Sequence, residues 1–137
     1  MAGGARVRTV TRPRWRDLEA ICAMHAALAA EHGLAGGRRR ARRLERSLAE
    51  PRKLMVEGVT DARRIAASYC AAVVRARPFS QGNGALALAA ACAVLRLGGY
   101  RLAAPEAEAV AVIRDLEAGE IGEPELEAWM ARNAAPL

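Results

Sequence analysis

The chain has 137 residues and a mass of 14.6 kDa, so we expect residues 1–137 to fold as one domain with its own core. Hydrophobic residues make up 53% of the sequence, aromatic residues only 4%, and about a quarter of all residues are alanine. Alanine favours helices and aromatic residues favour strands, so this composition argues against a β-sandwich or barrel and predicts an all-α fold. It also argues against a disordered chain, a collagen-like repeat and a disulfide scaffold.

The net charge of +6 is unevenly distributed along the chain. Residues 1–77 contain 17 Lys+Arg and 7 Asp+Glu, a net of +10, whereas residues 78–137 contain 4 and 8, a net of −4. The first part could therefore attract an anion, an acidic protein or nucleic acid. No apolar run is long enough to span a bilayer, and the N-terminus lacks the apolar region of a signal peptide. We expect a cytoplasmic protein that does not bind membranes.

The first predicted helix runs from about Arg14 to His32 and ends at Gly33. An arginine-rich segment follows at residues 36–46, for which a solvated face, an acidic protein partner and, least favoured, nucleic acid are the alternatives. A short helix marked by leucines 44 and 48 is expected to end at Pro51. Residues 52–60 contain glycine and β-branched residues, which favours a loop or a small flap hairpin that carries Lys53.

Asp61 is expected to open the next helix, which ends at Arg77 because Pro78 follows. Residues 85–98 are apolar on every side, which is typical of a buried central helix. Two amphipathic helices are predicted at about 105–118 and 124–133, and Trp129 and Met130 of the second are expected in the core. The pattern thus predicts a compact bundle of five or six helices around one buried helix.

A glycine-rich loop precedes the predicted central helix. The loop contains Gly82, Asn83 and Gly84, and glycines let a ligand approach the backbone closely. A helix N-terminus offers unpaired N–H groups and the positive end of its dipole, so an anion is expected here. Arg77 lies at the mouth of the loop and could pair with a phosphate. The alternative is a tight turn with no ligand.

Residues 77–84 read Arg-Pro-Phe-Ser-Gln-Gly-Asn-Gly. This segment resembles the signature of the Fic/Doc superfamily, His-Pro-Phe-x-Asp/Glu-Gly-Asn-Gly/Lys-Arg. The resemblance extends over about residues 15–103 and has the short length of the Doc (death-on-curing) branch. It implies an all-helical protein that transfers AMP, or in the Doc branch the terminal phosphate, from ATP to a protein hydroxyl. It also implies a toxin paired with an antitoxin. We call residues 77–85 the signature segment.

The chain departs from this signature where the family's chemistry is done. Arg77 stands in place of the catalytic histidine, and an arginine cannot accept a proton at neutral pH. Gln81 replaces the acidic residue that holds Mg²⁺, and Ala85 replaces the arginine that holds phosphates. Pro78 and Phe79 of the signature remain, as do the three loop residues of the expected anion site, Gly82, Asn83 and Gly84.

These departures predict a Doc-like protein with a degenerate active site that binds a partner protein, such as an antitoxin, or a nucleotide or phosphate. Arg77 could replace the metal, so ATP binding without Mg²⁺ is expected if a nucleotide binds at all. The alternatives are a transferase of altered, metal-independent chemistry and a regulatory module that dimerises. The three cysteines, 22, 70 and 92, are widely spaced and are interpreted as core thiols, with no metal site.

Overall fold

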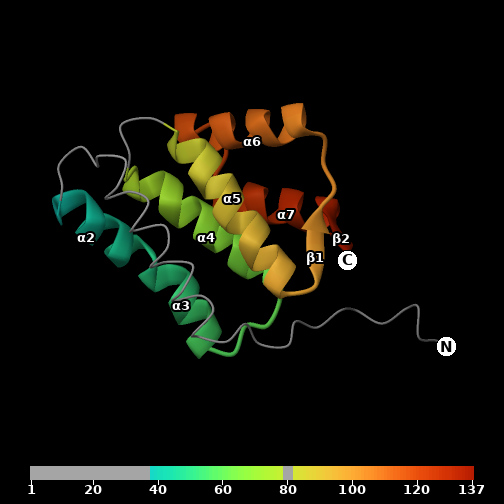
Figure 1. The fold of residues 1–137 in the computed structure, drawn as a ribbon, viewed down its shortest axis with the longest axis horizontal. Coiled ribbons are helices and arrows are strands. Elements are labelled where there is room, and N and C mark those ends of the chain that lie inside the picture. Colours follow the sequence, from blue (N-terminus) through green and yellow to red (C-terminus); the bar gives the residue numbers. More distant parts are fainter. Residues whose placement is uncertain (1–37, 79–81) are drawn as a thin grey trace.

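The computed structural model describes residues 38–78 and 82–137, which form a mostly helical fold with two short strands (Figure 1). The elements are α2 (Arg38–Ser47), α3 (Ala49–Val56), α4 (Ala62–Ala76), α5 (Asn83–Leu97), β1 (Tyr100–Leu102), α6 (Glu106–Ala118), α7 (Glu123–Asn133) and β2 (Ala134–Pro136). The predicted all-α class is confirmed. The predicted helix at 14–32, with its histidines and Cys22, lies outside the described residues. None of the described helices is long and apolar enough to cross a membrane.

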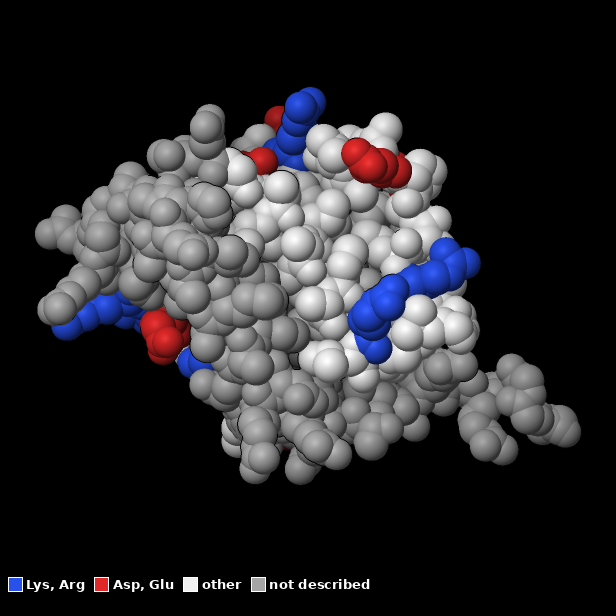
Figure 2. All heavy atoms as spheres, viewed as in Figure 1, with Lys and Arg blue, Asp and Glu red and all other residues white. Residues whose placement is uncertain are grey.

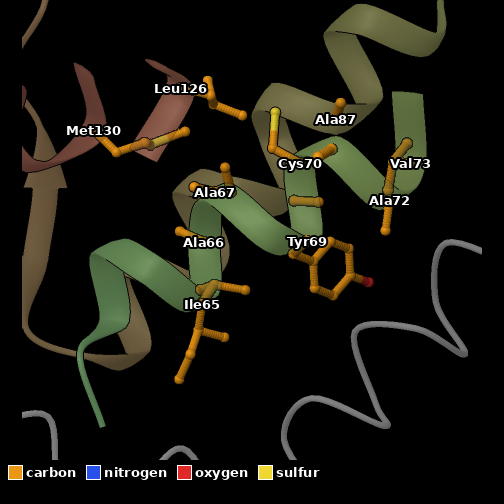
Figure 3. Packing of buried hydrophobic residues seen from close by; sticks show 14 of the residues in the cluster. Ile65, Ala66, Ala67, Tyr69, Cys70, Ala72, Val73, Ala87, Leu126 and Met130 are labelled. Atoms are coloured by element: carbon orange, nitrogen blue, oxygen red, sulfur yellow. The ribbon is translucent and has the colours of Figure 1, made fainter. Parts of the chain in front are cut away.

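Helix α4 lies at the centre of the described bundle. It begins where predicted, because the Asp61 carboxylate accepts a hydrogen bond of 3.0 Å from the backbone N–H of Arg63. Eleven of its fifteen residues are buried, most of them alanines. Helices α2, α3, α5 and α7 all pack on it. Figure 3 shows Ile65 and Tyr69 on one side of α4 and Cys70 on the side toward α5 and α7.

The prediction that residues 85–98 form the central buried helix is wrong. Helix α5 buries a single face, and Ala85, Ala89 and Leu97 are exposed. An alanine-rich helix looks apolar all round, yet an exposed alanine costs little, so its composition does not reveal whether a neighbour covers each face. The helix also begins two residues earlier than expected, at Asn83.

The predicted end of the short helix at Pro51 is wrong, and so is the loop or hairpin at 52–60 in its first part, since residues 52–56 belong to α3 and only 57–60 form a loop. A turn at Leu48 separates α2 from α3, and Pro51 lies in the first turn of α3. Proline is tolerated there because a first-turn N–H has no partner within the helix. Pro51 and Met55 are buried, while Lys53 is exposed.

The C-terminal part of the chain closes the fold beside α5. Gly98 ends that helix, and β1 pairs antiparallel with β2 so that Tyr100 lies opposite Pro136. This small sheet was not predicted. The last two helices were predicted within two residues, and Trp129 and Met130 are buried as expected. The Trp129 indole N–H donates to the Glu108 carboxylate at 2.8 Å, which joins α7 to α6.

Candidate functional site

Helix α4 ends at Ala76, and the next residue, Arg77, caps it in the left-handed backbone conformation, with φ 47° and ψ 60°. Arg77 is the only non-glycine residue of the described ranges with a positive φ. Its backbone N–H donates to the Val73 carbonyl at 3.1 Å, and the exposed residue is followed by buried Pro78. A left-handed conformation costs a residue with a Cβ about 1–2 kcal/mol. Phe79 and Gln81, to which the sequence assigned a packing and an acidic-position role, lie outside the described residues.

Gly82 forms the entrance to α5. It adopts φ 81° and ψ 10°, and its carbonyl accepts from the backbone N–H of Leu86 at 3.1 Å, which starts the helix. A Cβ on Gly82 would meet no described atom within 4 Å, so the backbone is open to a ligand at this point. Asn83 is the first residue of the helix and is buried, with 8% of its surface exposed. Asn83 therefore packs inside the fold, and little of its surface is accessible to a ligand.

Gly84 has a different environment from Gly82. A Cβ on Gly84 would lie 2.7 Å from Cγ2 of Ile113 and 3.2 Å from Oε1 of Glu117. Helix α6 can therefore pack against the first turn of α5 only because position 84 has no side chain. The same contact places the Glu117 carboxylate beside the positive end of the α5 dipole. No sequence pattern indicated that Glu117 lies here.

A pocket of about 680 Å³ begins at this entrance and follows α5 between that helix and α6. Its floor and walls are small or apolar, and three charged residues complete it. The lining residues are Gly82, Gly84, Ala85, Leu88, Ala89, Cys92, Val110 and Ile113, with Glu106, Arg114 and Glu117. Figure 2 shows a largely uncharged face in the region of α5. We call this the α5/α6 pocket. Its volume and its mostly apolar lining are typical of sites that bind small molecules.

The α5/α6 pocket brings together some of the predicted site residues. Gly82, Gly84 and Ala85 line it, whereas Arg77 and Asn83 are not among its described lining residues. Ala85 is exposed there, so an arginine at this position would have room to extend from the helix. Cys92 also lines the pocket and is half-buried.

A second pocket, of about 490 Å³, lies between α2, α3, α4 and α7. Its lining is dominated by charged residues: Arg43, Arg46, Ser47, Glu50, Arg75, Ala76 and Glu123. We call it the arginine pocket. Arg75 pairs with Glu123 at an Nη1–Oε1 distance of 3.8 Å. Burial raises the pKa of the Glu123 carboxyl, and the nearby Glu50 carboxylate adds to this rise against the opposing effect of Arg75. The arginine-rich segment of the sequence thus supplies one wall of a pocket.

The described cysteines have no sign of reactivity. Burial, with smaller contributions from Cys92 and Glu117, raises the pKa of the Cys70 thiol to about 12. Burial also raises the pKa of Cys92. Within residues 38–78 and 82–137, no three His, Cys, Asp or Glu side chains gather in a way that could hold a metal ion. Lys53 on α3 lines neither pocket.

Comparison with known protein families identifies the region that contains the signature segment. No curated protein matches the chain significantly. The family model for Fic/DOC proteins matches residues 15–95, which include α2, α3, α4, the signature segment and most of α5. The match covers more than half of the 137 residues, and the helix–loop–helix around Gly82 lies inside it. The chain therefore belongs to the Fic/DOC family.

Proposed function

We propose that this protein is a Doc-branch member with a degenerate active site, which binds a nucleotide or another phosphate-bearing ligand and is impaired in group transfer. The observation that carries the proposal is the α5/α6 pocket, which begins at the open backbone of Gly82 and continues along α5. Phosphates would lie at the helix N-terminus, and the apolar wall would take the uncharged body of the ligand.

The charged groups around this pocket support an anionic head group. The exposed Arg77 stands one loop away from Gly82, and Arg114 lines the pocket from α6. Guanidinium groups bind phosphate oxygens through paired N–H donors. Glu117 opposes this charge and would weaken the binding of any phosphate at the first turn of α5.

Impaired transfer follows from the residue types of the signature segment. Arg77 cannot act as a general base at neutral pH, and the loss of such a base typically slows a reaction by about 10²- to 10⁴-fold. Magnesium prefers carboxylate ligands, and the neutral amide of Gln81 fits it poorly. We therefore expect ATP to bind without a requirement for Mg²⁺.

Calorimetric titration of the protein with ATP, with and without Mg²⁺, tests this proposal. We expect equal affinity in both buffers and weaker binding by Arg77→Ala. The matched control is Arg96→Ala, which removes an exposed arginine from the far end of α5 and should bind ATP as wild type does. No ATP binding would mean that the site is vestigial, and binding that requires Mg²⁺ would contradict the assigned role of Arg77.

The alternative, an active transferase of altered chemistry, is favoured by one observation. The unfavourable backbone conformation of Arg77 resembles the strain that functional sites often hold. The triple variant Arg77→His, Gln81→Asp, Ala85→Arg distinguishes the two functions when incubated with labelled ATP and candidate target proteins. Transfer by the variant alone supports a degenerate site, whereas transfer by wild type supports the alternative.

The biological setting is also a proposal. We infer a cytoplasmic protein of a toxin–antitoxin lineage that acts as one domain, with an antitoxin-like protein as partner or a second copy of itself. Co-purification with the product of a neighbouring short gene would support the first partner. Light scattering coupled to size-exclusion chromatography would show the second.

A further inference from the structure

We propose that the arginine pocket is a binding site for a phosphate monoester, formed where Arg43 and Arg46 of α2 meet Arg75 of α4. The site lies apart from the α5/α6 pocket, and the two have none of their described lining residues in common. The inference therefore does not depend on the proposed function. The ligand is either a free nucleotide or a phosphorylated side chain of a protein, because both present the same terminal group.

The first argument is the unbalanced positive charge. Neither Arg43 nor Arg46 pairs with an acidic side chain of the described residues, and Arg75 reaches Glu123 only at 3.8 Å. The pair Arg63–Asp61 is much closer, with N–O distances of 3.0 and 3.2 Å. Like charges that line one pocket repel each other, and an anion between them removes that repulsion.

The second argument is the match between donors and ligand. Three arginines and Ser47, from two helices, line the pocket and can supply N–H and O–H donors. A carboxylate has two oxygens and is satisfied by one arginine, whereas a phosphate monoester has three terminal oxygens and a charge of about −1.5 to −2. A phosphate monoester, which has more acceptor oxygens and more negative charge than a carboxylate, therefore fits the three arginines better.

The third argument concerns the two glutamates, which limit the class of ligand. Glu50 and Glu123 reduce the formal charge of the described lining residues from +3 to +1, which is too small for an extended polyanion such as a nucleic acid backbone. A compact dianionic group can contact the arginines while the rest of the ligand extends into solvent through the open side of the pocket. The volume of about 490 Å³ is large enough for such a group.

Three probes test the site: inorganic phosphate, AMP, and a fluorescent phosphoserine peptide with its unphosphorylated counterpart. The double variant Arg43→Ala, Arg46→Ala should lower the affinity for the phosphorylated probes about tenfold or more, because charge-assisted hydrogen bonds are lost. Both residues are exposed on α2 and alanine favours helix, so the fold should remain. Arg42→Ala, an exposed neighbour that does not line the pocket, is the matched control and should bind normally.

Two further variants test the assignment with the phosphoserine peptide. Glu123→Gln should raise its affinity, since it removes a competing carboxylate, and Arg96→Ala, an exposed arginine that does not line the arginine pocket, should leave it unchanged. Binding of the phosphopeptide alone would identify a protein source, and equal binding of AMP would identify a general phosphate monoester site; both support the inference. It would be overturned by absence of binding, by equal binding of the unphosphorylated peptide, or by binding lost in Arg77→Ala and kept in the double variant.

Discussion

The carboxylate of Glu117 should weaken phosphate binding at the entrance to α5. Its Oε1 lies 3.2 Å from the position of a Cβ on Gly84, within the first turn of the helix. Two unit charges 4 Å apart repel by about 4 kcal/mol at an effective dielectric constant of 20 and by about 1 kcal/mol in water. Glu117 is exposed, so the repulsion should be near the lower value, about 1–2 kcal/mol for a phosphate. Glu117→Gln should therefore raise the affinity for ATP by about 5- to 30-fold.

Calorimetry at two salt concentrations provides the assay. The gain should shrink at high ionic strength because the interaction is partly screened. Glu120→Gln removes an exposed carboxylate just beyond the end of α6 and serves as the control, with no gain expected. Equal ATP affinity in wild type and Glu117→Gln would refute the reasoning.

Three further predictions concern the ends of α4 and α5. Gly84→Ala should lower the free energy of unfolding in urea by about 1–3 kcal/mol through its clash with Ile113, whereas Gly82→Ala should cost about 1–2 kcal/mol through its positive φ alone. A neutral Gly84→Ala would contradict the close packing of α6 on α5. Arg77→Gly should be more stable than Arg77→Ala by about 1 kcal/mol, and equal stabilities would contradict the left-handed backbone at that residue. Burial would raise the pKa of Asp61, but the hydrogen bonds from Arg63 outweigh it and the pKa is lowered. Its charged form thus stabilises the fold above about pH 4 and the contribution is lost as the pH falls through the lowered pKa. Melting curves of Asp61→Asn should differ most from wild type at neutral pH and converge in acid; a constant difference would contradict this.

The sequence predicted the fold best where single residues have strong local effects. Asp61 caps α4 because its carboxylate can reach the backbone N–H of Arg63, and this requires no knowledge of the rest of the fold. Gly119 adopts φ 76° at the end of α6, and Pro105 precedes the first residue of that helix. Such signals depend only on neighbours in the chain.

The errors arose where tertiary contacts decide the outcome. Alanine favours a helix whether its face is buried or exposed. The composition of α4 and α5 therefore did not show which of the two is more deeply buried. Pro51 can end one helix or begin another, and the packing of Met55 in the core favours the second. Strand β1 has three residues and is defined by its partner β2, thirty-four positions later. A segment so short has no periodicity of its own.

In the candidate sites too, local patterns could be predicted from the sequence and tertiary contacts could not. Gly82 could be found because a glycine-rich turn before an apolar helix is a local pattern. Glu117 and Arg114 could not, because they reach the entrance of α5 from a helix about thirty residues later in the chain. That Arg43 and Arg75 line the same pocket was likewise hidden, since they lie thirty-two residues apart on helices that the packing of the fold brings together. Sequence separation, more than residue type, determined what was missed.

The two glycines of the signature segment carry different information about function. Gly84 is required by the contact with Ile113, so its presence is explained by packing whether or not a ligand binds. A Cβ on Gly82 would meet none of the described atoms, so within the described residues Gly82 is required only by its backbone conformation at the start of α5. A chain that had lost all catalytic chemistry would still need Gly84 to hold α6 in place. The case for a surviving anion site therefore depends on Gly82 and on the pocket beyond it, and the titration with ATP addresses that pocket directly.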